Sequence, residues 1–106
     1  MFKLTNNINK AKTQFKQNKS NTLNEIGIFI KDRMDYYAPV DTGYLRSRNN
    51  YKVMNDSVLF LNDCEYAIFQ EYGTRYQSGT PFMRPAAFNH LGDIQRIAIN
   101  YLSRGF

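Results

Sequence analysis

Apolar side chains recur at helical spacing over the N-terminal third of the chain. They form two series, Leu4, Ile8, Ala11 and Phe15, and then Leu23, Ile26, Ile30, Met34 and Tyr37. Each series keeps one face of a helix apolar. The polar segment 16–22 between them is compatible with two helices or with one long helix that has a weak middle, and Thr22 with Glu25 matches the capping-box pattern. We predict a helix over residues 21–37, preceded by an earlier helical segment.

The residues after this helix carry signals that end it and turn the chain. Pro39 biases Ala38 away from helical backbone angles, so the helix should stop before it. Asp41-Thr42-Gly43 follows as a predicted turn, in which polar side chains can bind backbone amides and Gly43 permits a conformation that a side chain resists. Residues 44–48 are expected to form a short helical turn.

Two strand-like runs occupy the middle of the chain, at residues 51–54 and 57–62. Asn55-Asp56 between them favours a hairpin turn. In the second run, leucines alternate with Val58 and Phe60, so both faces are largely apolar. We expect this run to be an inner strand or one side of an interface.

The C-terminal part of the chain returns to helical patterns. Residues 66–72 favour a short helix that Gly73 closes, and residues 75–80 form a polar segment typical of exposed loops. Pro85 suits the first turn of a helix. One helix is predicted from Ala86 to near Gly105 by the spacing of Ala87, Leu91, Ile94, Ala98 and Tyr101.

Helices at both ends and strands grouped in the middle predict an α+β fold. A small antiparallel sheet, built on one hairpin, is expected to pack against a long N-terminal helix and a C-terminal helix. The length of 106 residues suits a single domain over residues 1–106. Within that domain, residues 1–20 are expected to be either a less ordered segment or a separate helical arm.

Composition and charge favour an assembling protein over a dedicated nucleic-acid binder. Aromatic residues make up 15% of the chain, with 8 Tyr and 8 Phe, and tyrosine suits surfaces that become buried on assembly. The formal net charge of +5 is dispersed along the chain, as on a solvated surface. The single cysteine allows no intrachain disulfide. No apolar run approaches the roughly 20 residues of a membrane span, so no membrane partner is expected.

Patterns that carry catalysis or bind metals are weak in this sequence. His90 is the only histidine, and no Cys/His cluster has metal-ligand spacing. A Cys64–His90 nucleophile pair is a minor hypothesis, and the favoured interpretation is a packed or partly exposed thiol and a helix-surface histidine. Acid–base work by Asp63, Glu65 and Glu71 is similarly less favoured than solvated or paired carboxylates. We expect no enzymatic activity, no metal site and no cofactor.

Three local motifs follow one another along the chain. They are Ala38-Pro39-Val40-Asp41-Thr42-Gly43-Tyr44-Leu45-Arg46, then Tyr66-Ala67-Ile68-Phe69-Gln70-Glu71-Tyr72-Gly73-Thr74, and then Pro81-Phe82-Met83-Arg84-Pro85-Ala86. Together they resemble the small tailed-phage morphogenesis family, also called the HK97-type tail-component or head–tail joining family, which includes neck and tail-completion proteins. The resemblance spans residues 25–102, and the chain departs from the family pattern at Ser47-Arg48-Asn49.

The resemblance implies a structural virion protein of a tailed bacteriophage, with no active site. Such a protein forms a homo-oligomeric ring in the neck, joins head and tail, and passes DNA through its lumen. Six subunits are favoured over twelve. The implied partners are copies of the chain itself, the adjacent connector or stopper protein, and tail-terminator or tail-tube proteins. The implied location is the virion, after assembly in the host cytoplasm, with non-specific contacts to DNA in the lumen.

Basic and aromatic residues interleave over residues 44–51 and 72–84. This mixture is typical of protein–protein interfaces and less strongly of nucleic-acid platforms, so a small basic nucleic-acid-binding protein is the alternative function. The interface candidates are Tyr44, Arg46, Tyr66, Phe69, Glu71, Tyr72, Arg75, Tyr76, Phe82 and Arg84. Glu71 is expected to pair with Arg84 or a neighbour's arginine, or to be an ordinary surface carboxylate. Phe82 is expected to fill its own core or that of an adjacent subunit.

Overall fold

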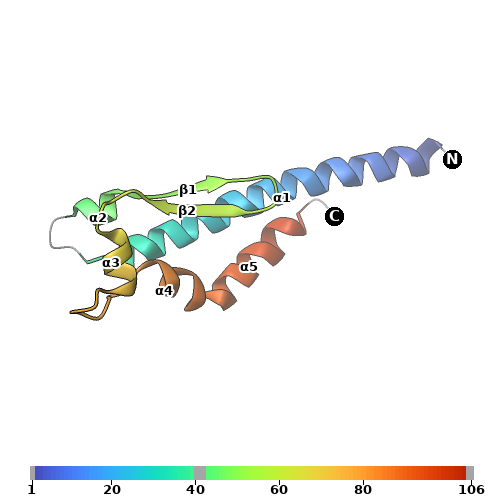
Figure 1. Ribbon diagram of the computed structural model, residues 1–106. Helices are drawn as coiled ribbons and strands as arrows, with labels where there is room; N and C mark the ends of the chain where they lie inside the picture. Colours follow the sequence, from blue (N-terminus) through green and yellow to red (C-terminus); the bar gives the residue numbers. More distant parts are fainter. Residues whose placement is uncertain (1, 40–42, 105–106) are drawn as a thin grey trace.

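One long helix, α1 (Phe2–Tyr37), organises the fold and runs along most of the molecule (Figure 1). The computed structural model describes residues 2–39 and 43–104, with side chains from residue 8 onward. The further elements are α2 (Tyr44–Ser47), β1 (Asn49–Val53), β2 (Val58–Asn62), α3 (Ala67–Tyr72), α4 (Met83–Phe88) and α5 (Leu91–Leu102). The predicted α+β fold, with a long first helix, a two-stranded antiparallel sheet and a C-terminal helix, is confirmed.

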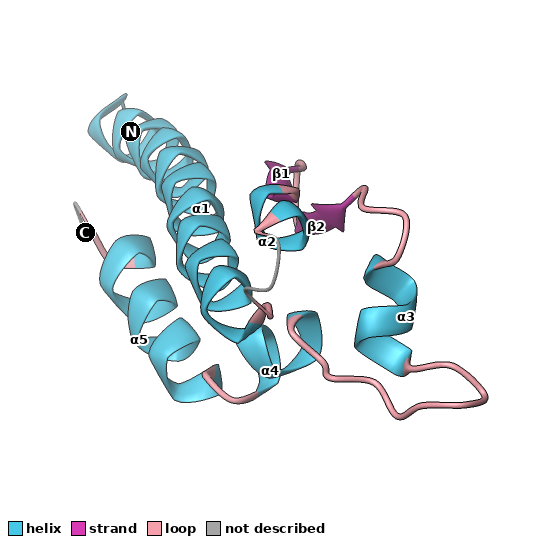
Figure 2. Cartoon of the chain, turned by 90° about the vertical axis from the view of Figure 1, so that its left-hand side faces the viewer, coloured by secondary structure: helices cyan, strands magenta, loops and turns pink. Residues whose placement is uncertain are grey.

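Helix α1 lies between the β hairpin on one side and α4 and α5 on the other (Figure 2). It is one continuous helix through the polar segment that sequence patterns left ambiguous. The predicted capping box is wrong, because the Thr22 hydroxyl donates to the carbonyl of Asn18 at 2.6 Å inside the helix. Asn18 is also buried, and its amide donates to the carbonyl of Leu102 at 3.0 Å. The polar middle of α1 is thus covered by the end of α5.

The end of α1 agrees with the prediction. The N–H of Ala38 makes the last helical hydrogen bond, to Met34 at 2.9 Å, and Pro39 follows. Asp41 and Thr42 of the predicted turn lie outside the described residues. Gly43 has a φ of 70° at the start of α2, in the left-handed region that favours glycine. The short helical turn is confirmed.

The hairpin starts earlier than its apolar pattern predicts. Its register pairs Asn49 with Asn62 and Val53 with Val58. Asn49 extends β1 because its buried side chain donates to Asp35 at 2.9 Å and accepts from Asn62 at 2.8 Å. The prediction of an inner strand is wrong, because β2 pairs only with β1 in the described sheet.

The hairpin docks on α1 through a close approach. A Cβ at Gly27 would lie 2.6 Å from Cε2 of the Tyr51 ring, so only glycine lets this ring rest on the helix. The Tyr51 hydroxyl donates to Asn24 Oδ1 at 2.8 Å. The inner face of the hairpin is therefore held against α1 by Tyr51, whose ring packs directly on the backbone at Gly27.

The predicted C-terminal helix is two helices, α4 and α5, separated at Asn89 and His90. The predicted surface position of His90 is also wrong, since its ring is half-buried and lies edge-on to Phe29. His90 Nε2 and the Tyr37 hydroxyl form a 3.0 Å hydrogen bond. This contact with the end of α1 redirects the chain at a point where the apolar spacing alone continues one helix. Gly105, the predicted end, lies outside the described residues, and α5 ends at Leu102.

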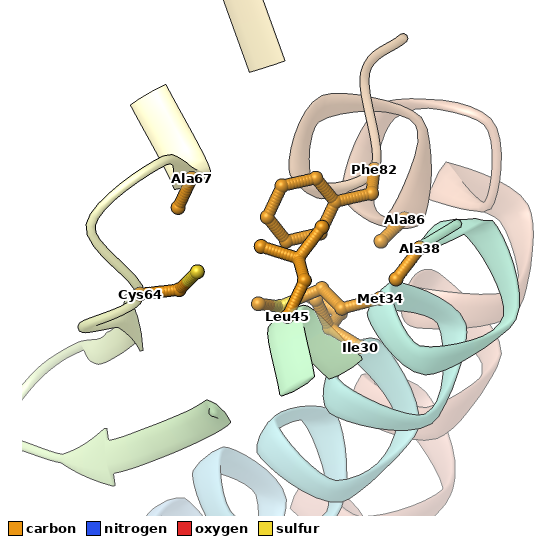
Figure 3. Close-up of a cluster of buried hydrophobic side chains, with 8 residues drawn as sticks. All are labelled: Ile30, Met34, Ala38, Leu45, Cys64, Ala67, Phe82 and Ala86. Atoms are coloured by element: carbon orange, nitrogen blue, oxygen red, sulfur yellow. The ribbon is translucent and has the colours of Figure 1, made fainter. Parts of the chain in front are cut away.

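The buried core brings all three sequence motifs together (Figure 3). It consists of Ile30, Met34, Ala38, Leu45, Cys64, Ala67, Phe82 and Ala86. The first motif contributes Ala38 and Leu45, the second Ala67, and the third Phe82 and Ala86. Phe82 and Met34 are its largest fully buried side chains. Of the two expected alternatives for each residue, Phe82 fills the core of its own chain and Cys64 is packed, not partly exposed.

Candidate functional site

The carboxylate of Glu71 joins α3 to the start of α4. Its Oε1 accepts the backbone N–H groups of Phe82 and Met83, both at 2.9 Å. Its Oε2 accepts the N–H of Arg84 at 3.0 Å and the Arg84 Nε–H at 2.8 Å. Glu71 is only 4% exposed. The expected pairing with Arg84 is confirmed within one chain, and the surface-carboxylate alternative is wrong because three backbone donors enclose the group.

Burial and hydrogen bonding act in opposite directions on Glu71. Burial raises the pKa of its carboxyl group, but the N–H groups of Met83 and Phe82 and the guanidinium of Arg84 together outweigh burial. The pKa of Glu71 therefore lies below its ordinary value. The second and third motifs are thus linked by an ionised carboxylate that caps the first N–H groups of α4.

The loop after α3 is exposed, as predicted, and its base is ordered by backbone contacts. Gly73 ends α3 with a φ of 84°, and its N–H donates to the carbonyl of Phe69 at 2.7 Å. Gly73 pairs with Ser78 as an isolated bridge, and the N–H of Thr80 donates to the carbonyl of Gln70 at 2.8 Å. The loop is therefore held at both ends, with its tip in solvent.

Replacing Gly73 with alanine should lower the free energy of unfolding by about 2 kcal/mol. The positive φ disfavours a side chain, and a Cβ would lie 2.6 Å from the Gln77 carbonyl oxygen. Urea unfolding measures the loss. Gly92→Ala is the matched control, because nothing lies within 4 Å of its added Cβ and the site is helical. It should be neutral or stabilising by up to about 1 kcal/mol; equal effects for the two variants would contradict the assigned strain.

Apolar and aromatic side chains gather on the outer face of α3. Ile68, Phe69 and Tyr72 are 65%, 54% and 68% exposed. The guanidinium of Arg84 lies over the Tyr72 ring at 4.6 Å from its centroid. We call Ile68, Phe69 and Tyr72 the α3 face. Since Glu71 is on the same short helix, the carboxylate on its inner side positions the α3 face on its outer side.

The other sequence-predicted interface residues surround this end of the molecule. Tyr44 and Tyr66 are exposed, with ring centroids 6.5 Å apart. Arg75 stacks on the exposed Tyr76 at 5.0 Å. The Arg46 side chain is half-buried and reaches the carbonyl of Ala38. The structure thus groups most of the candidates near α2 and α3, whereas Glu71 and Phe82 lie inside and hold the fold instead of offering surface.

Much of the positive charge outside the N-terminal region is paired with carboxylates. The described ion pairs of Lys and Arg are Lys19–Asp56, Lys31–Asp35, Arg48–Asp63, Arg84–Glu71 and Arg96–Asp93. Hydrogen bonding to Asp63 raises the pKa of Arg48 further above its ordinary range. These pairs weaken the field that a phosphate backbone would meet on this part of the surface.

No metal site or membrane span is found in the described ranges 2–39 and 43–104. No group of three or more His, Cys, Asp or Glu side chains there can hold a metal ion. None of the helices described is both long enough and apolar enough to span a membrane. Comparisons of the chain with family models, curated proteins and solved structures found no match.

Sequence reasoning missed a second surface, at the opposite end of the molecule. The N-terminal arm, residues 2–17 of α1, extends beyond the hairpin and α5 (Figure 1). Every side chain over residues 8–17 except Gln14 is exposed, including Ile8 and Phe15 at 47% and 52%. The signal was present in the sequence, because an apolar stripe at helical spacing requires something to cover it.

The arm makes the molecule elongated and rich in surface. The molecule measures 68 × 24 × 22 Å along its principal axes. Its radius of gyration is 18.2 Å, whereas a compact domain of this length has a radius of gyration of about 13 Å. The accessible surface is 7752 Å², whereas a compact monomer of 12.4 kDa has about 6,100 Å². The chain therefore exposes a surplus of about 1,600 Å².

Proposed function

We propose that this chain is a structural subunit of the neck of a tailed bacteriophage, forming a homo-oligomeric ring, favoured as a hexamer, that joins head and tail. The three motifs, which follow one another along the sequence, resemble those of the tailed-phage morphogenesis family, and this resemblance suggests the class of protein. Their side chains share one core, and Glu71 of the second motif binds the backbone of the third. Each motif therefore has a physical role in the same domain. This supports reading the three motifs as one joint signal of the family and not as three separate similarities.

The surplus surface is the observation that carries the proposal. In a closed ring, each subunit uses two unlike surfaces, one toward each neighbour. A standard interface takes about 800 Å² from each partner, so two such interfaces use about 1,600 Å² per subunit. The surplus of this chain has that size. Among its exposed apolar side chains, Ile8 and Phe15 of the arm and the α3 face lie at opposite ends of the molecule and form two unlike surfaces.

The charge distribution supports a passive collar. DNA must slide through the lumen of a neck, so its walls need little net attraction for phosphate. The ion pairs Arg48–Asp63 and Arg84–Glu71 neutralise two arginines of the segments 44–51 and 72–84, in which basic and aromatic residues interleave. A small nucleic-acid-binding protein would instead depend on unpaired cations and would bind in a strongly salt-dependent way.

A phage in which the coding region of this chain is interrupted tests the proposal. We expect filled heads and separate tails to accumulate, and supply of the intact chain in trans to restore joined particles. Mass spectrometry should find the chain in purified virions, and electron microscopy should place it as a ring in the neck. Infectious particles that form without the chain would overturn the proposal. Salt-dependent DNA binding by a monomer that never enters virions would favour the nucleic-acid alternative.

A further inference from the structure

The apolar stripe of the arm continues the face of α1 that is buried further along. Ile8, Ala11 and Phe15 are followed at helical spacing by Asn18 and Thr22, which are 2% and 4% exposed. The Asn18 amide donates to the carbonyl of Leu102, the last residue of α5, so α5 stops covering this face at that point. The stripe is therefore the uncovered extension of a helix face that is packed in the body of the molecule.

Over residues 2–17, α1 extends beyond the hairpin and α5, and most of the stability of a helix in a protein comes from packing of its apolar face. The arm also carries Lys10, Lys12 and Lys16, and no acidic residue precedes Glu25 in the chain. Lys12 and Lys16, which are four residues apart on the helix, carry like charges that repel each other. A partner that covers the stripe and brings aromatic rings and carboxylates to these lysines would stabilise the arm as a helix.

The α3 face offers that chemistry. Its exposed isoleucine, phenylalanine and tyrosine present apolar area, and the Phe69 ring can attract a lysine ammonium group, whereas Arg84 already lies over the Tyr72 ring. Glu65, just before α3, is exposed and supplies a carboxylate beside this face. The arm and α3 lie at opposite ends of the molecule, so the arm reaches an α3 face only on a second copy (Figure 1).

We propose that the stripe of Ile8, Ala11 and Phe15 packs on the α3 face of a second copy of this chain. The contact joins unlike surfaces, so each copy offers an arm to one neighbour and receives an arm from the other. It deepens the proposed function, on which it rests for the expectation of self-association. The lysines of the arm then lie near Glu65 of the neighbour, which gives the contact one orientation.

Sedimentation of the full chain with single substitutions tests the contact. Phe15→Asp and Phe69→Asp should each weaken self-association at least tenfold. Gln17→Asp is the matched control, because Gln17 is exposed on the opposite side of the arm and should leave association unchanged. Circular dichroism and the unfolding midpoint of dilute protein should be alike for wild type, Phe15→Asp and Gln17→Asp. A wild-type chain that stays monomeric up to about 1 mM, or Phe15→Asp and Gln17→Asp acting alike, would overturn the proposal.

Disulfide trapping identifies the two surfaces directly. Under mild oxidation, a mixture of Phe15→Cys protein and Ile68→Cys protein should give cross-linked dimers that neither gives alone. Wild type should give none, because Cys64 is buried. Dimers from Phe15→Cys alone would show arm–arm pairing, and dimers with Ile99→Cys in place of Ile68→Cys would place the arm on α5; both results contradict the proposal. The contact and the neck function can fail separately. If the cross-link forms in solution but virions assemble without the chain, the contact is supported and the neck function is contradicted.

Discussion

Replacing Phe82 with alanine should lower the free energy of unfolding by about 3–5 kcal/mol. The ring is fully buried beside Met34 and Leu45, at the point where α1, α2 and α4 meet (Figure 3). Its removal deletes buried apolar contacts and leaves a cavity that helices on several sides cannot easily close. Such a loss is a large share of the 5–15 kcal/mol that stabilises a typical domain. Urea unfolding followed by circular dichroism measures it.

Phe88→Ala is the matched control for this substitution. It removes the same atoms from a ring six positions along the chain that is 66% exposed. We expect a loss within about 1 kcal/mol. Equal losses for the two variants would contradict the assignment of Phe82 to the core. A Phe82→Ala protein that unfolds normally but no longer self-associates would instead give Phe82 the role of contacting a neighbouring subunit.

The elements that sequence patterns predict well depend on residues close together in the chain. Pro39 ends α1 because it acts on the backbone of its immediate neighbour, and Gly73 ends α3 through its own φ. The hairpin turn is likewise local, with the Met54 N–H donating to the carbonyl of Ser57 at 2.7 Å. Such signals survive folding because tertiary contacts rarely reverse a steric preference of the backbone.

The wrong predictions arise where a polar side chain finds a partner far away in the sequence. Asn18 made the middle of α1 look weak, yet it binds carbonyls at the end of α5. His90 looked like a residue of a helix surface, yet it binds Tyr37 and marks the break between α4 and α5. Apolar spacing cannot reveal these contacts, because it records which faces are buried and not which distant groups meet.

The same distinction explains the candidate site. Exposure of Phe69, Tyr72 and Tyr76 agrees with their choice as surface residues, because mixed basic and aromatic segments favour surfaces. Glu71 was chosen for the same surface, but only the fold brings three backbone N–H groups to its carboxylate. Whether the exposed residues contact a neighbour stays a prediction.

Replacing Glu71 with alanine should lower the free energy of unfolding by about 3 kcal/mol at neutral pH. The variant leaves the N–H groups of Phe82, Met83 and Arg84 without their acceptor at the start of α4. Glu71→Gln keeps one amide oxygen and should lose about half as much. Glu65→Ala is the matched control, because Glu65 is an exposed carboxylate six residues earlier and should change stability by about 0.5 kcal/mol or less.

The pH dependence separates the charge of Glu71 from its shape. Hydrogen bonds hold the pKa of this carboxyl group in the folded chain below its ordinary value of 4.5. The folded state therefore binds the proton less readily than the unfolded state. The stabilising contribution of the ionised Glu71 carboxylate is complete above the pKa of the unfolded state and is lost as pH falls through the pKa of the folded state. The stability gap between wild type and Glu71→Gln should be constant near pH 7 and should shrink below about pH 4.5. A gap that stays the same at low pH would show that the amide fails for steric reasons, and that ionised Glu71 does not hold the two motifs together.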